Sequence, residues 1–452
     1  MVQRILADAS PQKRLFISLI TRDITLIDAM LDLIDNSINA ALAPIADQLR
    51  TADDYQKLLA NKQVKPKVEI NIRIGSARIA IDDNAPGIPL EMAQKHVFKF
   101  GRDEGDEEPT DRLSVYGIGL KRAIFKCGNR ISIASDHRSG GFELKLSDVK
   151  AWAKEKVLGP DGREEPNWTF PITARPPAAK AACGTRIMIT QLHDETLRRI
   201  DDGLFLVQLG ERIAKTYSFY IGRIVTIILN NEVIGKELFE IGANRNSKQF
   251  RSGAVTCNVT AGMAIVAGET FRERNAGWYI FCNGRAVLFA DKSPVTGWGT
   301  GLPLFQAKHR AFLGTVFFVS ANAEELPWST TKSSINEESA LWQEARAHMI
   351  AVGRLVTRFL DSRYTDEGTT VAQEELRKAV GERMSVLDAA VAADHVFKPP
   401  RTAARRTQKI QYDAKISDIR KIEDHLRKKM GGSEVGRFTF NWYLKNEVGG
   451  DE

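Results

Sequence analysis

Residues 25–42 have the pattern of apolar and polar positions that is typical of a helix with one buried face. Apolar side chains recur at helical spacing, at Ile27, Leu31, Ile34 and Ile38. The opposite side carries Asp28, Asp32, Asp35, Asn36 and Asn39. The segment contains three aspartates and no lysine or arginine. Solvated helix faces usually mix charge signs, because like charges four residues apart repel. The stripe therefore suggests a bound cation near Asp32 and Asn36; a plain exposed face is the alternative.

Alternating polarity predicts a β-hairpin over residues 68–82. Apolar and polar residues alternate from 68 to 74, and Gly75-Ser76 marks a tight turn into the returning strand. Asp83 follows at the end of that strand and enters a turn that contains Pro86-Gly87. A carboxylate held rigidly at a strand end suits ligand recognition, whereas a simple turn cap is the alternative interpretation.

Two glycines precede a further predicted helix. Gly117 and Gly119 stand just before residues 120–126, and a strand is predicted at 130–135. Glycines allow the backbone to approach a ligand closely, and free amides at a helix N-terminus bind phosphate. Taken alone, this pattern is also compatible with an ordinary turn.

The order of these motifs resembles the Bergerat ATP-binding fold of the gyrase, heat-shock chaperone, histidine kinase and MutL (GHKL) superfamily. The motifs are Asp32-x-x-x-Asn36, Asp83-x-x-x-Gly87, Gly117-x-Gly119 and Gly184-Thr185, which opens a strand predicted at 186–190. The resemblance implies that the chain binds ATP with Mg²⁺. We therefore expect an α/β fold whose first domain is a Bergerat α/β sandwich.

The resemblance also implies roles for the motif residues. Asn36 would hold Mg²⁺. Asp83 would accept a hydrogen bond from the adenine amine, with a water molecule and Thr185 completing the contact. Asp32 occupies the position of the glutamate that activates the attacking water in hydrolysing members.

The remaining glycines and a lysine have implied roles around the nucleotide. Gly87 would let the backbone pass close to it, and Gly117 and Gly119 would cradle the phosphates with Lys121 nearby. The acidic segment between Lys99 and Gly117 corresponds to the lid of the superfamily; a solvated loop is the alternative.

Four positions depart from the superfamily pattern. Asp32 replaces a glutamate, Asn39 an aspartate, and Ala85 and Ser114 replace glycines. Because aspartate is one methylene shorter than glutamate, ATP binding follows from the motifs more directly than hydrolysis does.

The second half of the chain alternates predicted strands and helices. A helix at 197–214 is followed by strands at 224–229, 257–267, 277–282 and 315–320, with turns at Asn230-Asn231 and Asn283-Gly284, and then by helices at 339–360 and 371–392. This pattern resembles the transducer domain of MutL, gyrase and MORC proteins, in which a lysine reaches the terminal phosphate. Lys332 is the candidate catalytic lysine, and an exposed loop lysine is the alternative.

Tyr116-Gly117-Ile118-Gly119-Leu120-Lys121 resembles the phosphate loop of MORC ATPases, which implies an ATP-dependent homodimer. We predict four parts: an ATP-binding domain (1–200), a transducer-like domain (201–365), a helical segment (366–397), and a basic linker with a small C-terminal module (398–452).

Charge is concentrated near the C-terminus. Residues 398–430 contain 11 Lys and Arg against 4 Asp and Glu, a net of +7 that equals the net charge of the whole chain. A concentrated basic segment suits the phosphates of DNA, whereas a solvated linker with a docking module is the alternative. Within that module we predict a short strand at 410–412 and a helix at 416–430, and we expect its aromatic residues to form a core.

Composition is that of a globular protein. The chain has 452 residues, of which 43% are hydrophobic and 27% charged. It has no run of 18 apolar residues and no apolar signal segment, so we expect a cytoplasmic protein without membrane contact. The cysteines lack CxxC spacing and are expected to be buried thiols.

Two classes of function compete. The first is an ATP-gated dimeric clamp on nucleic acid, in the manner of MORC proteins, acting in genome defence or maintenance. The second is a chaperone-like ATPase that remodels protein clients. A nucleotide-binding scaffold with little turnover is a third possibility, because of Asp32.

Overall fold

The computed structural model describes residues 12–61, 67–101, 113, 117–159, 162–237, 240–265, 273–364, 382–398 and 410–448. Residues 1–400 and 401–452 form two separate compact units. The predicted lid falls mostly on residues 102–112 and 114–116, which lie outside the described residues.

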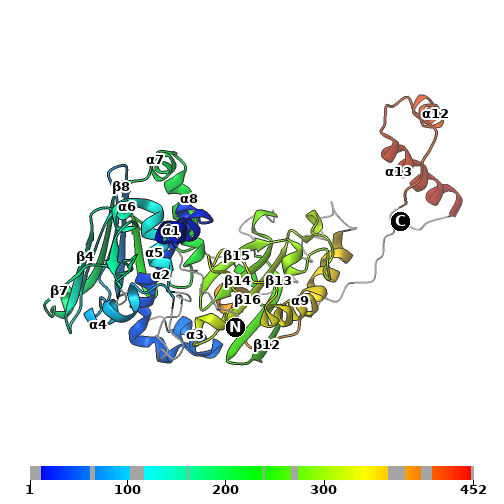
Figure 1. Ribbon diagram of the computed structural model, residues 1–452. Helices are drawn as coiled ribbons and strands as arrows, with labels where there is room; N and C mark the ends of the chain where they lie inside the picture. The colour runs from blue at the N-terminus through cyan, green and yellow to red at the C-terminus, as the bar shows by residue number, and fades with distance from the viewer. Residues whose placement is uncertain are drawn as a thin grey trace, which may run out of the picture. The chain divides into compact units, whose positions relative to one another are not determined.

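The first unit contains a large mixed sheet, which includes β4, β7 and β8 of Figure 1. Its eight strands have the order β10-β9-β1-β2-β8-β3-β4-β7. Its strands are β1 (Val68–Gly75), β2 (Arg78–Asp83), β3 (Gly128–Asp136), β4 (Gly141–Leu146), β7 (Ile172–Arg175), β8 (Gly184–Leu192), β9 (Val225–Leu229) and β10 (Glu232–Val233). The helices of this part are α1 (Lys13–Arg22), α2 (Leu26–Leu42), α3 (Ala52–Ala60), α4 (Leu90–Met92), α5 (Gly119–Cys127), α6 (Val149–Trp152), α7 (Asp194–Ile200) and α8 (Phe205–Thr216). A small hairpin of β5 (Lys156–Leu158) and β6 (Glu164–Pro166) lies beside them.

The predicted helices and strands around the motifs are confirmed. Strands β1 and β2 pair as an antiparallel hairpin in which Gly75 faces Arg78. The apolar side chains of β1 are buried and its polar ones point outward, as the alternation requires. Helices α2 and α5 pack on each other and on this sheet, which brings the acidic stripe and the glycine turn together.

Strand β9 joins this first sheet rather than the second. It pairs with β1 in parallel, with Ile70 opposite Ile227. The large sheet therefore continues past residue 200. The helix predicted at 197–214 consists of α7 and α8, because Asp202 turns the chain between them by accepting a hydrogen bond from the Leu204 amide (3.1 Å).

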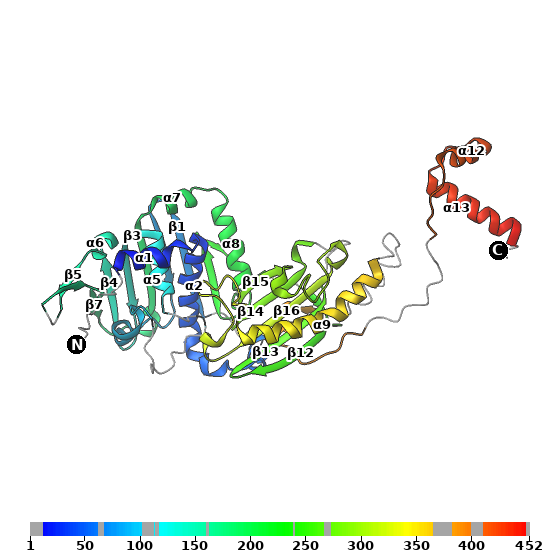
Figure 2. The ribbon, with the colours of Figure 1, turned by 45° about the vertical axis from the view of Figure 1, so that its right-hand side comes forward.

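The second sheet has five strands in the order β12-β13-β16-β14-β15, with α9 (Ala340–Tyr364) packed along β12, β13 and β16 (Figure 2). Its strands are β12 (Asn246–Ser252), β13 (Val255–Met263), β14 (Gly277–Cys282), β15 (Arg285–Asp291) and β16 (Phe312–Val319). The turn predicted at Asn283-Gly284 is confirmed, since both residues have the positive φ (48° and 84°) that a two-residue hairpin turn requires.

The helix predicted at 371–392 is confirmed only for residues 386–390 and is wrong for residues 383–385, while residues 371–381 lie outside the described residues. Residues Arg383–Ser385 form β17, which pairs with β11 (Glu240–Gly242), and α11 covers only Val386–Ala390. Ser385 caps that helix by accepting a hydrogen bond from the Asp388 amide (3.1 Å). A serine cap favours extended backbone before the helix, which explains the change from strand to helix here.

The second unit contains α12 (Ile416–Leu426), α13 (Gly432–Tyr443) and a π-helical end (Leu444–Val448). The strand predicted at 410–412 is wrong, because these residues have no β partner. Helix α12 ends before residue 430 because Arg427 adopts a left-handed conformation (φ 50°). The expected aromatic core is also wrong, since Phe438, Phe440, Trp442 and Tyr443 are all exposed.

All four cysteines are buried thiols without a disulfide, as predicted. Within the described ranges, no helix combines the length and apolar character that a membrane span requires.

Candidate functional site

Helix α2 carries the acidic residues Asp28, Asp32 and Asp35. It starts with a capping box, in which Thr25 accepts from the Asp28 amide (3.1 Å) and Asp28 accepts from the Thr25 amide (3.2 Å). Asp28 is therefore a capping residue. Asp32 and Asp35, one and two turns further along, are only 2% and 1% exposed. A plain exposed face is excluded for these two residues, and each must have counter-charges from elsewhere in the chain.

Asp83 is held as an oriented acceptor at the end of β2. Its Oδ2 accepts a hydrogen bond from the Ser37 hydroxyl (2.7 Å), and its Oδ1 accepts from the backbone amides of Ala85 (3.1 Å) and Thr185 (3.2 Å). Burial raises the pKa of Asp83, and these hydrogen bonds only partly oppose that rise. The hydroxyl of Thr185 lies 3.0 Å from that of Ser135 on β3. The structure thus brings Asp83 and Thr185 together.

Gly87 is required by the protein's own backbone. Its φ is +76°, and a Cβ there would lie 2.1 Å from the carbonyl oxygen of Asp136. A side chain at this position would push the turn after β2 away from β3. The glycine therefore keeps the turn that follows Asp83 against the sheet.

The glycine turn leads into α5 beside the acidic residues of α2. Gly117 has a left-handed φ of +61°. A Cβ at Gly119 would lie 3.4 Å from Oδ1 of Asp32, so this carboxylate packs against the first residue of α5. The free amides of a helix N-terminus and the candidate residues of α2 therefore meet at one place.

Asn36 has an unsatisfied polar atom at this place. Its Nδ2 is buried and has no hydrogen-bond partner among the residues that the structure describes. A buried amide without a partner is costly, and such atoms often mark ligand sites. The unsatisfied Nδ2 is a donor and suits an acceptor such as a phosphate oxygen, whereas the amide oxygen of the same side chain is a ligand that Mg²⁺ accepts. Asn36 therefore fits a site that holds both phosphate and the ion that the motif implies.

Lys121 does not stand free for a ligand. Its Nζ donates to the carbonyl oxygens of Val97 (2.9 Å) and Lys99 (2.6 Å). The side chain is fully buried, and this burial lowers its pKa to about 7. In this conformation Lys121 supports the segment that leads into the predicted lid.

Asp32 forms a two-point ion pair with Arg122 of α5. Arg122 donates from Nε to Oδ2 (2.5 Å) and from Nη2 to Oδ1 (2.8 Å). Burial alone would lower the pKa of Arg122, but the hydrogen bond and charge of Asp32 hold it above its usual value. Both oxygens of the candidate catalytic carboxylate are therefore engaged by a cation.

Asp35 joins α2 to the second sheet. Its carboxylate accepts from Lys332 Nζ (2.7 Å), Arg285 Nε (3.0 Å) and the Tyr217 hydroxyl (2.7 Å). Burial alone would raise the pKa of Asp35, but the charges of Arg285 and Lys332 hold it below its usual value. Lys332, which has a left-handed φ of 54°, thus contacts the residue that precedes Asn36 on α2.

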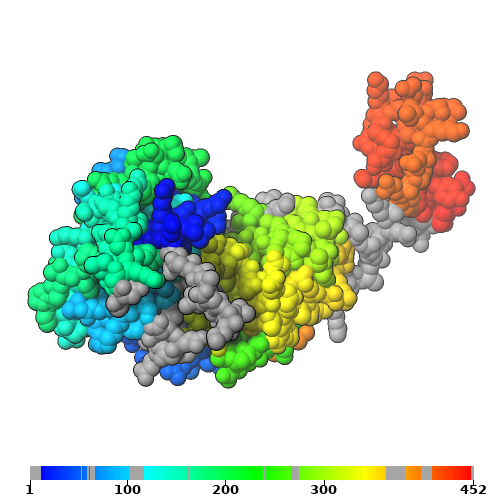
Figure 3. Space-filling view, viewed as in Figure 1, coloured from blue at the N-terminus to red at the C-terminus, as the bar shows by residue number. Residues whose placement is uncertain are grey.

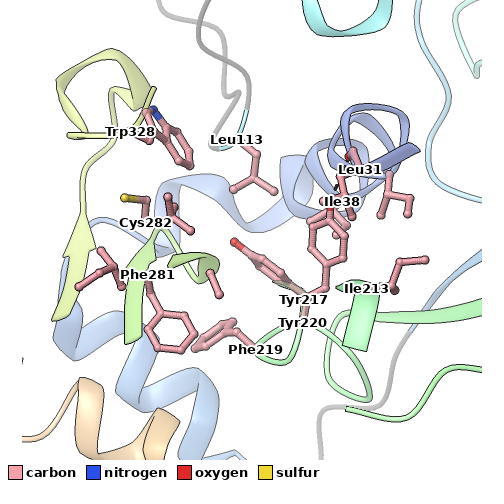
Figure 4. Packing of buried hydrophobic residues seen from close by; sticks show 14 of the residues in the cluster. Leu31, Ile38, Leu113, Ile213, Tyr217, Phe219, Tyr220, Phe281, Cys282 and Trp328 are labelled. Atoms are coloured by element: carbon pink, nitrogen blue, oxygen red, sulfur yellow. Dashed lines mark hydrogen bonds between the residues drawn. The ribbon is translucent and has the colours of Figure 1, made fainter. Parts of the chain in front are cut away.

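Apolar side chains surround this ionic cluster. Figure 4 shows Tyr217 between Leu31 and Ile38 of α2 on one side and Phe281 and Cys282 of β14 on the other. The low polarity around the cluster strengthens the interactions of its charges and makes an unpaired charge costly.

Sequence reasoning missed Arg122, Arg285 and Tyr217. One signal for Arg122 was present: Lys121 and Arg122 are two cations in the first turn of a helix, where the dipole disfavours positive charge. Such a pair indicates nearby anionic partners. Arg285 follows the Asn283-Gly284 turn, and no feature of the neighbouring sequence indicates that it belongs to the site.

Residues 24–161 match the family model described as histidine kinase-, DNA gyrase B-, and HSP90-like ATPase. The match supports a GHKL-type ATPase domain in this part of the chain. It spans α2, the Asp83 turn, the glycine turn and α5, whereas Thr185, Arg285 and Lys332 lie beyond it. No curated protein matches the chain. The GHKL-type domain suggests that the protein binds ATP, typically with Mg²⁺.

The lowered pKa of Lys121 predicts a pH-dependent stability. The unfolded chain keeps this proton up to about pH 10.5 and the folded chain only up to about pH 7. Between these values the unfolded state binds more protons, so the free energy of unfolding rises with pH. Lys121→Met should flatten this rise in urea unfolding between pH 7 and pH 10. Lys150→Met, at an exposed lysine, should leave it unchanged. Equal slopes for the parent and Lys121→Met would contradict the assignment.

Proposed function

We propose that this protein is a Mg²⁺-dependent ATPase of GHKL type in which the second sheet responds to the nucleotide through Lys332. The observation that carries the proposal is the position of Asn36. Its buried amide nitrogen, which has no partner within the described part of the chain, lies on α2 next to Asp35, the residue that binds Lys332.

Each group around this point has a chemical task in the proposal. Asp83 accepts from the adenine amine, because Ser37 and two backbone amides fix its oxygens. Thr185 completes the base contact through water. The amides that follow Gly117 and Gly119 bind phosphate oxygens at the start of α5. Bound Mg²⁺ neutralises phosphate charge, and Asn36 supplies the protein ligand.

A second candidate function is a nucleotide-binding scaffold with little turnover. The observation that favours it is the ion pair between Asp32 and Arg122, which engages both oxygens of the candidate base. A carboxylate can orient the attacking water only with a free oxygen. Turnover therefore requires that Arg122 release Asp32.

We propose further that ATP drives the chain into a homodimeric clamp on DNA, in the manner of MORC proteins. Helix α1 lies on the surface (Figure 3), and its Leu15 and Leu19 are 57% and 59% exposed, which suits contact with a partner. Residues 398–409 contain five Lys and Arg and no Asp or Glu. Such a segment suits the DNA backbone.

The ATP site is tested first by Asn36→Ala. We expect this variant to bind ATP roughly 100-fold more weakly in Mg²⁺, because the ion loses its protein ligand. Calorimetry with Mg²⁺ and with EDTA checks this: the metal should strengthen ATP binding by the parent but not by the variant. Asn71→Ala, on the solvent face of β1, is the control. Equal metal dependence in Asn36→Ala and the parent would contradict the site.

The clamp is tested by replacing Arg401, Arg405 and Arg406 with Gln in the full chain. Each lost phosphate contact should reduce the slope of log affinity against log salt by about 0.9, so the slope should fall by about 3. Fluorescence anisotropy with duplex DNA measures this, and light scattering of the same samples should report a dimer with a non-hydrolysable ATP analogue.

The matched control replaces three exposed lysines of the first unit, Lys145, Lys150 and Lys154, with Gln. An unchanged slope in the arginine variant, or a monomer with the analogue, would contradict the clamp. Protein clients bound without DNA would favour the chaperone-like alternative.

A further inference from the structure

The pair formed by Asp32 and Arg122 is a buried ion pair at the junction of α2 and α5. Asp32 is 2% and Arg122 3% exposed, and two hydrogen bonds join them. The carboxylate also packs against Gly119, the first residue of α5. The pair therefore stands where the phosphates are proposed to bind.

Stability alone gives little reason for such a pair. The cost of removing two charges from water often exceeds their mutual attraction, so apolar residues of similar volume frequently serve as well. The pair also puts a cation in the first turn of α5, against the helix dipole. Both the buried pair and the cation at the helix N-terminus are explained if a second anion binds the same guanidinium.

Arginine is suited to such an exchange. Its planar group binds carboxylate and phosphate by the same two-point geometry. Arg122 lies in the first turn of α5, where its amide donates to the carbonyl of Ile118 (2.9 Å). The guanidinium thus starts from the helix end that would hold the phosphates.

We propose that Arg122 is a positioning residue that changes partner from Asp32 to the terminal phosphate of ATP. Without nucleotide, Arg122 engages both oxygens of Asp32 and keeps it from orienting water. ATP takes over the guanidinium and frees Asp32, whereas ADP, which lacks that phosphate, leaves the pair intact. This inference rests on the proposed ATP site. We call the exchange of partners by Arg122 the gate, because it decides whether Asp32 is free to orient water.

The gate predicts a change in the ratio of ATP to ADP affinity. ATP must break the ion pair in the parent, whereas in Asp32→Asn the guanidinium is already available. Asp32→Asn should therefore raise the ratio of ATP to ADP affinity by roughly tenfold or more. Loss of simple repulsion between Asp32 and phosphate would also raise this affinity ratio in Asp32→Asn. That gain, however, would not depend on Arg122.

A double-mutant cycle separates these two causes. The parent, Asp32→Asn, Arg122→Gln and the double variant are titrated with ADP and with a non-hydrolysable ATP analogue. In the Arg122→Gln background, Asp32→Asn should change the ratio by less than about twofold. An equal gain in both backgrounds, or no gain in either, would overturn the gate.

A second measurement uses the parent chain, and needs only one charge-conserving variant for assignment. In the unmodified chain labelled with [¹⁵N]arginine, the Arg122 Nε–H resonance is assigned by its absence in Arg122→Lys. It should shift with the ATP analogue and stay in place with ADP. A resonance unmoved by the analogue would overturn the gate. A parent chain that binds neither nucleotide would instead overturn the proposed function.

Discussion

The buried carboxylate of Asp35 is the group on which the arrangement of the first unit depends. A carboxylate that is 1% exposed is tolerated only with charged and hydrogen-bonding partners. Its partners Tyr217, Arg285 and Lys332 come from the segment after α8, the start of β15 and a loop after β16. Arg285 also donates to the carbonyl oxygen of Lys332 (2.7 Å), which ties these partners to one another. Removing one partner from such a cluster typically costs about 3–5 kcal/mol.

This cluster links the second sheet to the candidate nucleotide site because both use α2. Asp32, Asp35 and Asn36 lie within two turns of one helix, so a shift of that helix would move all three. Asp32 pairs with Arg122 of α5, and Asp35 pairs with Arg285 of the second sheet and with Lys332 in the loop after β16. In the proposed site, the phosphates of ATP would act on both sets of charges at once.

Local sequence signals were enough for the parts of the site that are built from neighbouring residues. The hairpin before Asp83, helix α2 and the turn at Gly117 follow from alternation, helical spacing and glycine. The partners of the acidic stripe could not be found in that way. Asp32 pairs with a residue 90 positions away and Asp35 with one 250 positions away. The strand β17 was missed for a similar reason, since its partner β11 lies about 140 residues earlier in the chain.

The coupling of the second sheet to the nucleotide is tested most directly by ATP hydrolysis in Lys332→Ala. This variant loses one partner of Asp35, but Arg285 and Tyr217 still contact the carboxylate, so we expect a less stable protein that urea unfolding shows to be folded under the assay conditions. Loss of one preorganised charge at the terminal phosphate should lower turnover by roughly 100-fold or more, while ADP affinity hardly changes. Lys308→Ala, which removes a lysine paired with Asp361, should leave both unchanged. Unchanged turnover in Lys332→Ala, or equal losses of ATP and ADP binding, would contradict the account.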